Sequence, residues 1–300
     1  MNRRPQDITD AAPTGWRLWA LAARPRTLTV SVAPVLVGTA LAWQQAETFR
    51  LAPMLVALAA AMLIQIGTNL HNDVADAVRG GDQPLRQGPA RVTAAGWASP
   101  ERVRLATAIA FGLAALAGIY LVAVGGWPIF ALGLGSLIAG WAYSGGPHPI
   151  SYSPFGEAFV VLFFGLGAVV GSAWLQSESV TPDALLAGLV VGLPAAAVLT
   201  VNNTRDIAAD RAAGRRTLSI LLGVEDSKWL YVALVLLPFP LLALAPMGAL
   251  VGLGALPLAL VQTRALMSQD PGPGYNPILA ATARTQLVMA ALMSVGMVLA

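Results

Sequence analysis

Long stretches without charged residues divide this chain. Seven stretches contain no Asp, Glu, Lys or Arg, and they are residues 27–46, 51–72, 105–156, 158–177, 184–204, 229–263 and 285–300. A helix that crosses a membrane needs about 20 mostly apolar residues. The stretches 105–156 and 229–263 are each long enough for two such helices, and each is interrupted by Gly and Pro, at 125–128 and at 245–248, where helices tend to end.

The pattern therefore predicts an all-α polytopic membrane protein with nine transmembrane helices. The predicted spans are residues 27–46, 51–70, 102–123, 127–143, 156–176, 183–201, 228–245, 247–266 and 281–299. Residues 27–300 would form the transmembrane domain, and residues 1–26 would form a basic N-terminal tail. Arg3-Arg4 is followed by Pro5, Gln6 and Asp7 rather than by an apolar run, so the tail does not resemble a cleavable signal peptide.

Composition excludes several classes of protein. Of the 300 residues, 56% are hydrophobic and 11% are charged, whereas a soluble domain has about 25% charged residues. A soluble globule, a disordered chain and a nucleic-acid-binding protein are therefore excluded, despite the net charge of +3. The absence of Cys excludes disulfides, thiol catalysis and Cys-based metal sites.

The basic residues predict the orientation. With nine spans and a cytoplasmic N-terminus, 17 of the 18 Lys and Arg residues lie on the cytoplasmic side, and Arg50 is the exception. Cytoplasmic loops carry the excess of Lys and Arg in membrane proteins. Moving one early boundary to give eight or ten spans would scatter these charges over both sides.

Two polar segments recur at an offset of 130 residues. Asn72 and Asp76 in the first segment align with Asn202 and Asp206 in the second. Each segment lies at the cytoplasmic end of an even-numbered span, four spans apart, so both would face the same side. We interpret this as two tandem four-helix repeats plus one helix, arranged around a central cavity.

The spacing of the acids indicates a cation site. Asn202, Asp206 and Asp210 are four residues apart, so they share one face of a helix. Asn69, Asn72, Asp73 and Asp76 share a face if the second span continues past Leu70. Because stacked carboxylates repel one another near a membrane, such a cluster indicates a bound cation. Mg²⁺ takes oxygen ligands and is commonly held by carboxylates together with substrate phosphates.

Arginines accompany both acidic segments. Arg79, Arg86 and Arg91 follow the first segment, and Arg205, Arg211, Arg215 and Arg216 belong to the second. Arginine binds phosphate oxygens in a bidentate manner. Acids and arginines at the mouth of an apolar cavity suit a ligand with a diphosphate head and a hydrocarbon tail. The alternative is that these are ordinary loops, in which Asp caps helices and Arg follows the charge bias of membrane loops.

In these two acidic segments the sequence resembles the UbiA superfamily of membrane prenyltransferases. Asn72-Asp73-Val74-Ala75-Asp76 and the segment from Asn202 to Asp210 resemble its two Asp-rich motifs. Within the superfamily, the chain is most similar to the 1,4-dihydroxy-2-naphthoate polyprenyltransferases of menaquinone synthesis. The stretches that resemble this subgroup are residues 24–28, 87–92, 143–147 with 156–157, and 210–218.

The resemblance implies Mg²⁺-dependent transfer of a prenyl group from a polyprenyl diphosphate to an aromatic acceptor, with loss of the acceptor's carboxylate as CO₂. It implies that Asp73 and Asp76 hold one Mg²⁺, and that Asp206 and Asp210 hold the other. Asn72, Asn202, Arg79 and Arg215 would support the metals and the diphosphate. Two positions depart from the usual pattern: Gly80 replaces an acid that is displaced to Asp82, as in the naphthoate subgroup, and Arg215 replaces a common Lys.

Further binding residues are predicted around this site. Arg26 enters the first span at the same membrane face and would contact the acceptor carboxylate, unless it only reaches lipid headgroups. Asn69 would face the cavity, and Arg91 would bind phosphate. Tyr143 would stabilise an allylic cation, or pack in the interfacial aromatic belt. Glu157 is either a site residue or an acid favoured at a helix N-terminus.

The sequence is also compatible with three alternatives. The acceptor could be hydroxybenzoate or homogentisate, and the donor could be phytyl diphosphate. A transporter also has repeats and polar groups within the membrane, although its sites lie near the midplane. The predicted location is a bacterial inner membrane, with the lipid bilayer as partner. The sequence predicts neither the length of the prenyl chain nor the oligomeric state.

Overall fold

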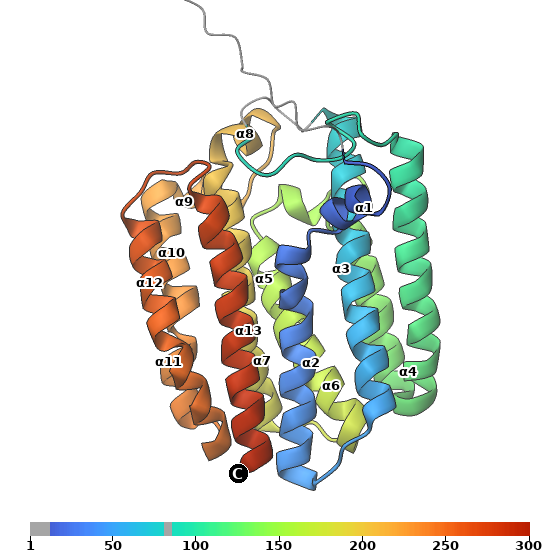
Figure 1. The fold of residues 1–300 in the computed structure, drawn as a ribbon, viewed down its shortest axis with the longest axis vertical. Coiled ribbons are helices and arrows are strands. Elements are labelled where there is room, and N and C mark those ends of the chain that lie inside the picture. Colours follow the sequence, from blue (N-terminus) through green and yellow to red (C-terminus); the bar gives the residue numbers. More distant parts are fainter. Residues whose placement is uncertain (1–12, 81–85) are drawn as a thin grey trace, which may run out of the picture.

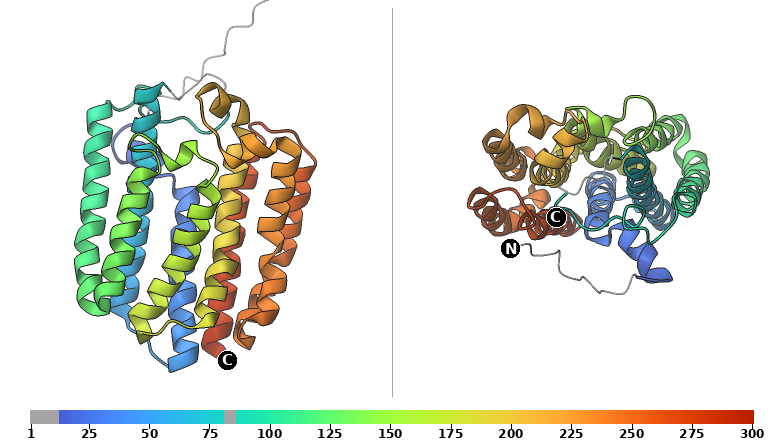
Figure 2. Two further views of the ribbon diagram at one scale, coloured as in Figure 1. Left: turned by 180° about the vertical axis from the view of Figure 1, so that it is seen from behind. Right: turned by 90° about the horizontal axis from the view of Figure 1, so that it is seen from above.

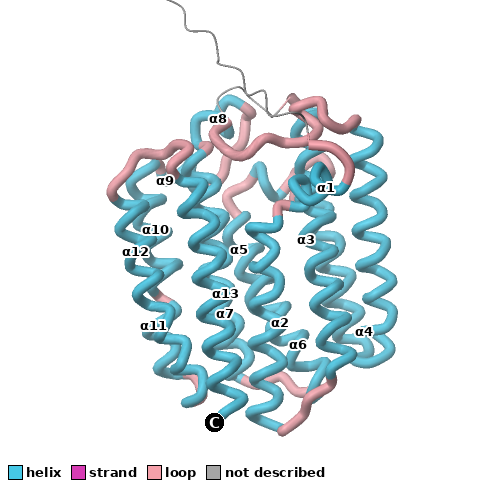
Figure 3. The backbone as a smooth tube through the Cα atoms, viewed as in Figure 1, coloured by secondary structure: helices cyan, strands magenta, loops and turns pink. Residues whose placement is uncertain are grey.

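The computed structural model describes residues 13–80 and 86–300, and within these ranges every regular element is a helix (Figures 1 and 3). The first half contains α1 (Trp16–Ala23), α2 (Pro25–Ala46), α3 (Leu51–Arg79), α4 (Pro100–Ala142), η1 (Ile150–Tyr152), α5 (Gly156–Val160), the π-helical segment η2 (Val161–Gly167) and α6 (Ala168–Ser177). The second half contains α7 (Pro182–Arg205), α8 (Ile207–Ala212), α9 (Leu218–Leu222), α10 (Val224–Leu236), α11 (Pro238–Leu241), η3 (Leu242–Leu244), η4 (Met247–Ala255), α12 (Leu256–Met267) and α13 (Tyr275–Leu299).

The predicted multi-pass architecture is confirmed. In the described ranges, eight helical stretches are long and apolar enough to cross a membrane. One of them, α4, is 43 residues long and has non-helical backbone at Gly126. A Cβ added at Gly140 on one side of this break would lie 3.3 Å from the ring of Phe111 on the other side, so α4 folds back on itself. Its two arms correspond to the predicted spans 102–123 and 127–143, which accounts for the difference between eight stretches and nine predicted spans.

The long helix α3 carries the first acidic motif. It continues past Leu70 to Arg79, nine residues beyond the predicted end of the span. The condition for Asn69, Asn72, Asp73 and Asp76 to share one helical face is therefore met. The second motif differs slightly, because α7 ends at Arg205 and α8 begins at Ile207. Asp206 lies between the two helices, although its carbonyl still accepts the backbone N–H of Asp210 at 2.8 Å.

The folded region begins before the predicted boundary at residue 27. The short helix α1 lies within the predicted tail and packs against α3, with Leu18 and Ala22 buried. The side chain of Asn69 donates a hydrogen bond of 3.0 Å to the carbonyl of Ala23, so α1 is attached to the motif helix. The dipeptide Arg3-Arg4 lies outside the described residues.

Close packing of small residues holds the bundle together. A Cβ added at Gly165 in η2 would lie 2.7 Å from the Cα of Gly192 in α7, so the two backbones approach closely. Small residues permit such contacts between membrane helices. Seen from above, the helices surround a central region (Figure 2), and the largest apolar core lies among α2, α6, α7 and the C-terminal helices.

Both acidic motifs lie at one end of the bundle. The C-terminal end of α3 and the segment α7–α8 are on the same side, together with the loops that follow them (Figure 1). Arg50 lies at the opposite end, where its backbone N–H donates to the side chain of Gln176 at 2.5 Å. We call the end with the motifs the motif end.

Candidate active site

A central cavity of about 1200 Å³ extends from the motif end into the bundle. Apolar side chains such as Val30, Leu132 and Phe163 line much of its wall. Its charged and strongly polar lining comprises Arg17, Arg24, Arg26, Gln65, Asn69, Asn72, Arg86, Arg91, Tyr143, Asn202, Arg205, Asp206, Asp210, Arg215 and Asn276. The cavity therefore combines an apolar body with a strongly basic mouth.

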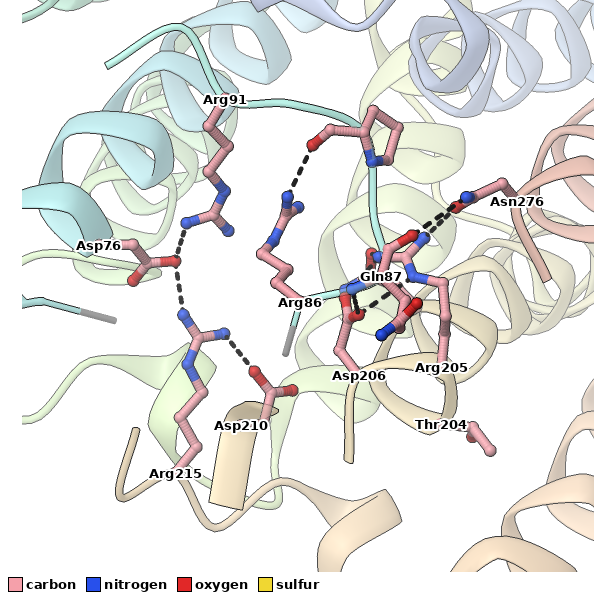
Figure 4. A network of polar contacts seen from close by, with 12 residues as sticks. Asp76, Arg86, Gln87, Arg91, Thr204, Arg205, Asp206, Asp210, Arg215 and Asn276 are labelled. Carbon is pink, nitrogen blue, oxygen red and sulfur yellow. Dashed lines mark hydrogen bonds and ion pairs between the residues drawn. The ribbon is translucent and has the colours of Figure 1, made fainter. Parts of the chain in front are cut away.

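Arg215 joins the two acidic motifs. Its Nη2 donates to Asp76 Oδ2 at 2.5 Å, and its Nη1 lies 3.4 Å from Asp210 Oδ1 (Figure 4). Asp76 is completely buried and also forms an ion pair with Arg91. Carboxylates that are 134 positions apart in the sequence are thus held together by one guanidinium.

The second motif is organised around Arg205. Its Nη2 donates to Asp206 Oδ2 at 2.5 Å and to Asn202 Oδ1 at 2.8 Å. Its Nη1 donates to Asn276 Oδ1 at 2.7 Å (Figure 4). Asn276 belongs to α13, so the C-terminal helix contributes directly to the mouth of the cavity.

A loop of residues 86–93, which we call the strap, connects the two motifs. The backbone N–H of Gln87 donates to Asp206 Oδ1 at 2.9 Å, and its carbonyl accepts from Asn276 Nδ2 at 3.2 Å. At the other end of the strap, Arg91 pairs with Asp76. A Cβ at Gly88 would lie 2.6 Å from Arg205 Nη2, so the strap reaches Arg205 this closely because residue 88 has no side chain.

Asp73, which is predicted to be a metal ligand, contacts the strap. Its Oδ2 accepts the backbone N–H of Val92 at 2.9 Å, and its Oδ1 accepts that of Thr93 at 3.0 Å. It is buried and is not part of the cavity lining. Because both oxygens are engaged, Asp73 anchors the C-terminal end of the strap to α3.

Other predicted residues fall into two groups. Arg26, Asn69, Asn72, Arg91, Tyr143 and Asn202 line the cavity, although the Arg26 side chain is exposed. Arg79 does not line it, and instead its Nη2 donates to the carbonyl of Gly146 at 2.9 Å. The guanidinium of Arg79 also lies over the ring of Tyr152, as does that of Arg215 at 5.0 Å. Asp82 lies outside the described residues.

Burial and neighbouring charges shift the protonation equilibria at the mouth. Burial raises the pKa of Asp210 to about 6; the nearby Asp206 and Asp76 also raise it, and Arg215 opposes them. Burial by itself would raise the pKa of Asp206 as well, but the hydrogen bond from Arg205 and the charge of Arg205 hold that pKa below its usual value. Burial and the charge of Arg91 lower the pKa of Arg86 to about 9 and that of Arg24 to about 10. The mouth therefore carries concentrated positive charge, which favours an anionic ligand.

The oxygen atoms present suit a hard divalent cation. Asn72 Oδ1, Asp76 Oδ1 and Asp210 Oδ2 are buried and have no hydrogen-bond partner among the described residues. Carboxylate and amide oxygens are the ligands that Mg²⁺ takes. Within residues 13–80 and 86–300, however, no three acidic or His side chains are close enough to form a ready-made metal site. Arginines occupy the space between the acids.

Two residues of the mouth were missed by sequence reasoning. Asn276 follows a Pro- and Gly-containing loop and has no local signal, because its partners Gln87 and Arg205 are distant in sequence. Arg24 lies in the left-handed region, with φ of 56°. Its position before Pro25 was the available signal, since a following proline disfavours the right-handed helical conformation.

Comparison with known proteins gives consistent results. The model of the UbiA prenyltransferase family matches residues 31–273. A 1,4-dihydroxy-2-naphthoate octaprenyltransferase of Mycobacterium tuberculosis is 37% identical, covering 91% of this chain and 94% of that protein. The protein of the same name in Escherichia coli is 35% identical, covering 97% of this chain and 98% of that protein.

Solved structures share the fold. A UbiA homologue from Archaeoglobus fulgidus bound to GPP and Mg²⁺ has a TM-score of 0.69, with 16% identity, and covers 94% of this chain and 100% of that one. A UbiA homologue from Aeropyrum pernix has a TM-score of 0.66, with 16% identity, covering 91% of this chain and 97% of that chain. At these identities the likeness concerns the fold alone.

Proposed function

Because this chain belongs to the UbiA prenyltransferase family, we propose that it is a membrane prenyltransferase that transfers a polyprenyl group from a polyprenyl diphosphate to 1,4-dihydroxy-2-naphthoate. The products would be demethylmenaquinol, CO₂ and diphosphate. The observation that carries this proposal is the combination of an apolar cavity with a mouth formed by two acidic motifs and several arginines. The cavity suits the prenyl chain, and the mouth suits the diphosphate.

Mg²⁺ is the cofactor in this proposal. Asp76 with Asn72 would hold one ion, and Asp206 and Asp210 with Asn202 would hold the other. Their unpartnered oxygens, on Asn72, Asp76 and Asp210, support this set, and a related structure contains Mg²⁺ together with GPP. When bound, Mg²⁺ neutralises charge that develops on the leaving diphosphate. In this scheme Asp73 acts by anchoring the strap to α3.

The reaction balances without an oxidant or reductant. The bond between the allylic carbon and the diphosphate oxygen breaks, and its electron pair leaves with the diphosphate. The electron-rich ring forms a new bond to the allylic carbon at the position of its carboxylate. CO₂ then leaves, and the electron pair of its bond returns to the ring, so the product is the quinol.

The residues of the chain have separate tasks. Arg91 and Arg215 would turn from Asp76 toward phosphate oxygens when substrate binds, since Arg grips phosphate with two donors. Arg26 and Asn69 would contact the acceptor or the diphosphate, and Arg79 would hold the loop around Gly146 in place. The apolar wall excludes water from the allylic cation. Tyr143 lines the cavity, and its ring would face that cation.

The protein is a multi-pass membrane protein. We place it in a bacterial inner membrane with the motif end in the cytoplasm. Of the 18 basic residues, 17 fall on the side of the motifs when the spans are counted from the sequence, in accordance with the positive-inside rule. In this orientation the soluble diphosphate product is released into the cytoplasm.

An acceptor panel tests the proposal. Purified protein in lipid vesicles receives a polyprenyl diphosphate, Mg²⁺ and one of three acceptors: dihydroxynaphthoate, hydroxybenzoate or homogentisate. We expect prenylation of the naphthoate alone, and loss of activity in Asp76→Asn and Asp206→Asn. Prenylation of another ring in its place would overturn the assignment of dihydroxynaphthoate as the acceptor. If both variants showed normal Mg²⁺-dependent turnover, the assignment of Asp76 and Asp206 as metal ligands would be overturned.

A further inference from the structure

Arg24 has an unusual backbone conformation at the junction of α1 and α2. Its φ of 56° and ψ of 63° place it in the left-handed region, which costs free energy for residues other than Gly and persists where surrounding contacts impose it. Those contacts are present: its N–H donates to Leu21 O at 3.1 Å, and its carbonyl accepts both the N–H and the hydroxyl of Thr27. Asn69 fixes the preceding carbonyl of Ala23.

This fixed backbone directs a cation into the wall of the cavity. Arg24 lines the cavity, and its electrostatic neighbours are Asp73, Asp76, Arg91 and Arg205. Four other arginines of the mouth bind protein groups. They are Arg86, Arg91, Arg205 and Arg215. The guanidinium of Arg24 has no hydrogen bond or ion pair with any described residue, although it lies in the same basic cluster.

A second polar group lies deeper along the same helix. Ser31 is 1% exposed and lines the cavity, and its hydroxyl has no hydrogen-bond partner among the described residues. From Pro25 to Ser31, α2 rises by about 9 Å. Arg24 directly precedes this helix, so the arginine and the orphaned hydroxyl lie at different depths along α2. This arrangement suits an aromatic ring that carries a carboxylate near one end and a hydroxyl further along.

We propose that Arg24 binds the carboxylate of the aromatic acceptor and that the ring extends along α2 toward Ser31. The inference rests on the proposed function and names the residue that selects an acidic acceptor. It differs from the sequence-based prediction of Arg26, whose side chain is exposed at the first turn of α2. Arg91, Arg205 and Arg215 are already attached to the acids that accompany the diphosphate. Arg17 and Arg26 also line the cavity, but their side chains are exposed, whereas Arg24 is half-buried and is therefore the better placed to bind a second anion.

The test compares binding of two acceptors that differ in the carboxylate. Dihydroxynaphthoate serves as the substrate, and naphthalene-1,4-diol, which lacks the carboxylate, serves as the probe whose Ki is measured against it. The variant Arg24→Asn removes the guanidinium but tolerates the left-handed backbone, and Arg24→Lys retains the charge. We expect Arg24→Asn to raise the KM for the naphthoate at least 10-fold, with an unchanged Ki for the diol and an unchanged KM for the prenyl diphosphate. Arg24→Lys should restore part of the loss.

Each other outcome overturns the inference in a distinct way. A raised KM for the prenyl diphosphate would assign Arg24 to the donor. If Arg26→Gln raised the KM for the naphthoate without changing the Ki for the diol, and Arg24→Asn did not, the carboxylate would be assigned to Arg26. An unchanged naphthoate KM in Arg24→Asn would remove the role altogether. Failure of the unmodified protein to prenylate the naphthoate would instead contradict the proposed function. Arg102→Gln, an exposed arginine at the start of α4, controls for general loss of positive charge.

Discussion

Arg215 Nη2 donates a hydrogen bond of 2.5 Å to Asp76 Oδ2, although the two residues are 139 positions apart. The same guanidinium lies 3.4 Å from Asp210. One side chain from the second motif therefore bridges both acidic motifs. The contact explains how these acids are accommodated together, because arginine supplies the positive charge between them.

Substitution of Arg215 should show the value of this bridge. Lysine keeps the charge but lacks the planar fork that reaches two carboxylates. We expect Arg215→Ala to lower kcat/KM by about 100-fold, which is the scale of losing one preorganised charge donor. Arg215→Lys should lose less. Arg216→Ala is the matched control, because Arg216 is the next residue in the chain and its own side chain is exposed. Equal activity of the Arg215→Ala and Arg216→Ala proteins would contradict the bridge.

Asp76 should matter for stability as well as for activity. It is completely buried and pairs with both Arg91 and Arg215. Removing one partner of a buried ion pair costs about 3–5 kcal/mol, because the remaining charge is uncompensated. Asp76→Asn should therefore lower the Tm in detergent and abolish turnover. The double variant Asp76→Asn with Arg91→Gln should recover part of the Tm without recovering activity; no recovery of Tm would argue against the pairing.

Gly88 offers a test of the strap. Alanine at this position would place a Cβ 2.6 Å from Arg205 Nη2, and Arg205 is already held by Asn202, Asp206 and Asn276. Gly88→Ala should therefore displace the strap or Arg205 and lower kcat/KM by about 10-fold or more. Gly112→Ala is the control, because nothing lies within 4 Å of its added Cβ. If the Gly88→Ala protein were as active as the Gly112→Ala protein, the strap would tolerate the added Cβ, and the prediction would be contradicted.

The raised pKa of the Asp210 carboxyl leads to a prediction of how the Mg²⁺ requirement changes with pH. Burial, together with the charges of Asp206 and Asp76 and against the charge of Arg215, raises its pKa to about 6. Above pH 6 the carboxylate is ionised and available to Mg²⁺, and below pH 6 protons compete with the metal. The Mg²⁺ concentration for half-maximal activity should thus rise as pH falls from 7 to 5. Asp210→Asn should need more Mg²⁺ and respond less to pH. A wild-type Mg²⁺ requirement that does not change over this pH range would contradict the prediction.

The sequence predicted the membrane architecture because the relevant signal is local. Charge-free stretches identify spans directly, and the break at Gly125-Gly126 correctly predicted where α4 reverses. The recurrence of Asn72 and Asp76 at Asn202 and Asp206 likewise pointed to two segments that the structure places at the same end of the bundle.

The partners of the site residues could not be predicted in the same way. Asp73 has the same spacing signal as Asp76, yet its carboxylate binds backbone groups of the strap. That difference depends on the path of residues 86–93, which no periodicity encodes. Asn276 became visible once distant segments were brought together, because its contact with Gln87 across 189 positions leaves no local pattern.

The most direct test of the central claim is the stoichiometry of products from carboxyl-labelled dihydroxynaphthoate. Purified protein in vesicles is given this acceptor, a polyprenyl diphosphate and Mg²⁺, and labelled CO₂ and prenylated quinol are measured together. We predict equal amounts of the two, dependent on Mg²⁺ and absent in Asp206→Asn. Prenylation of a different acceptor without release of labelled CO₂ would contradict the proposed activity.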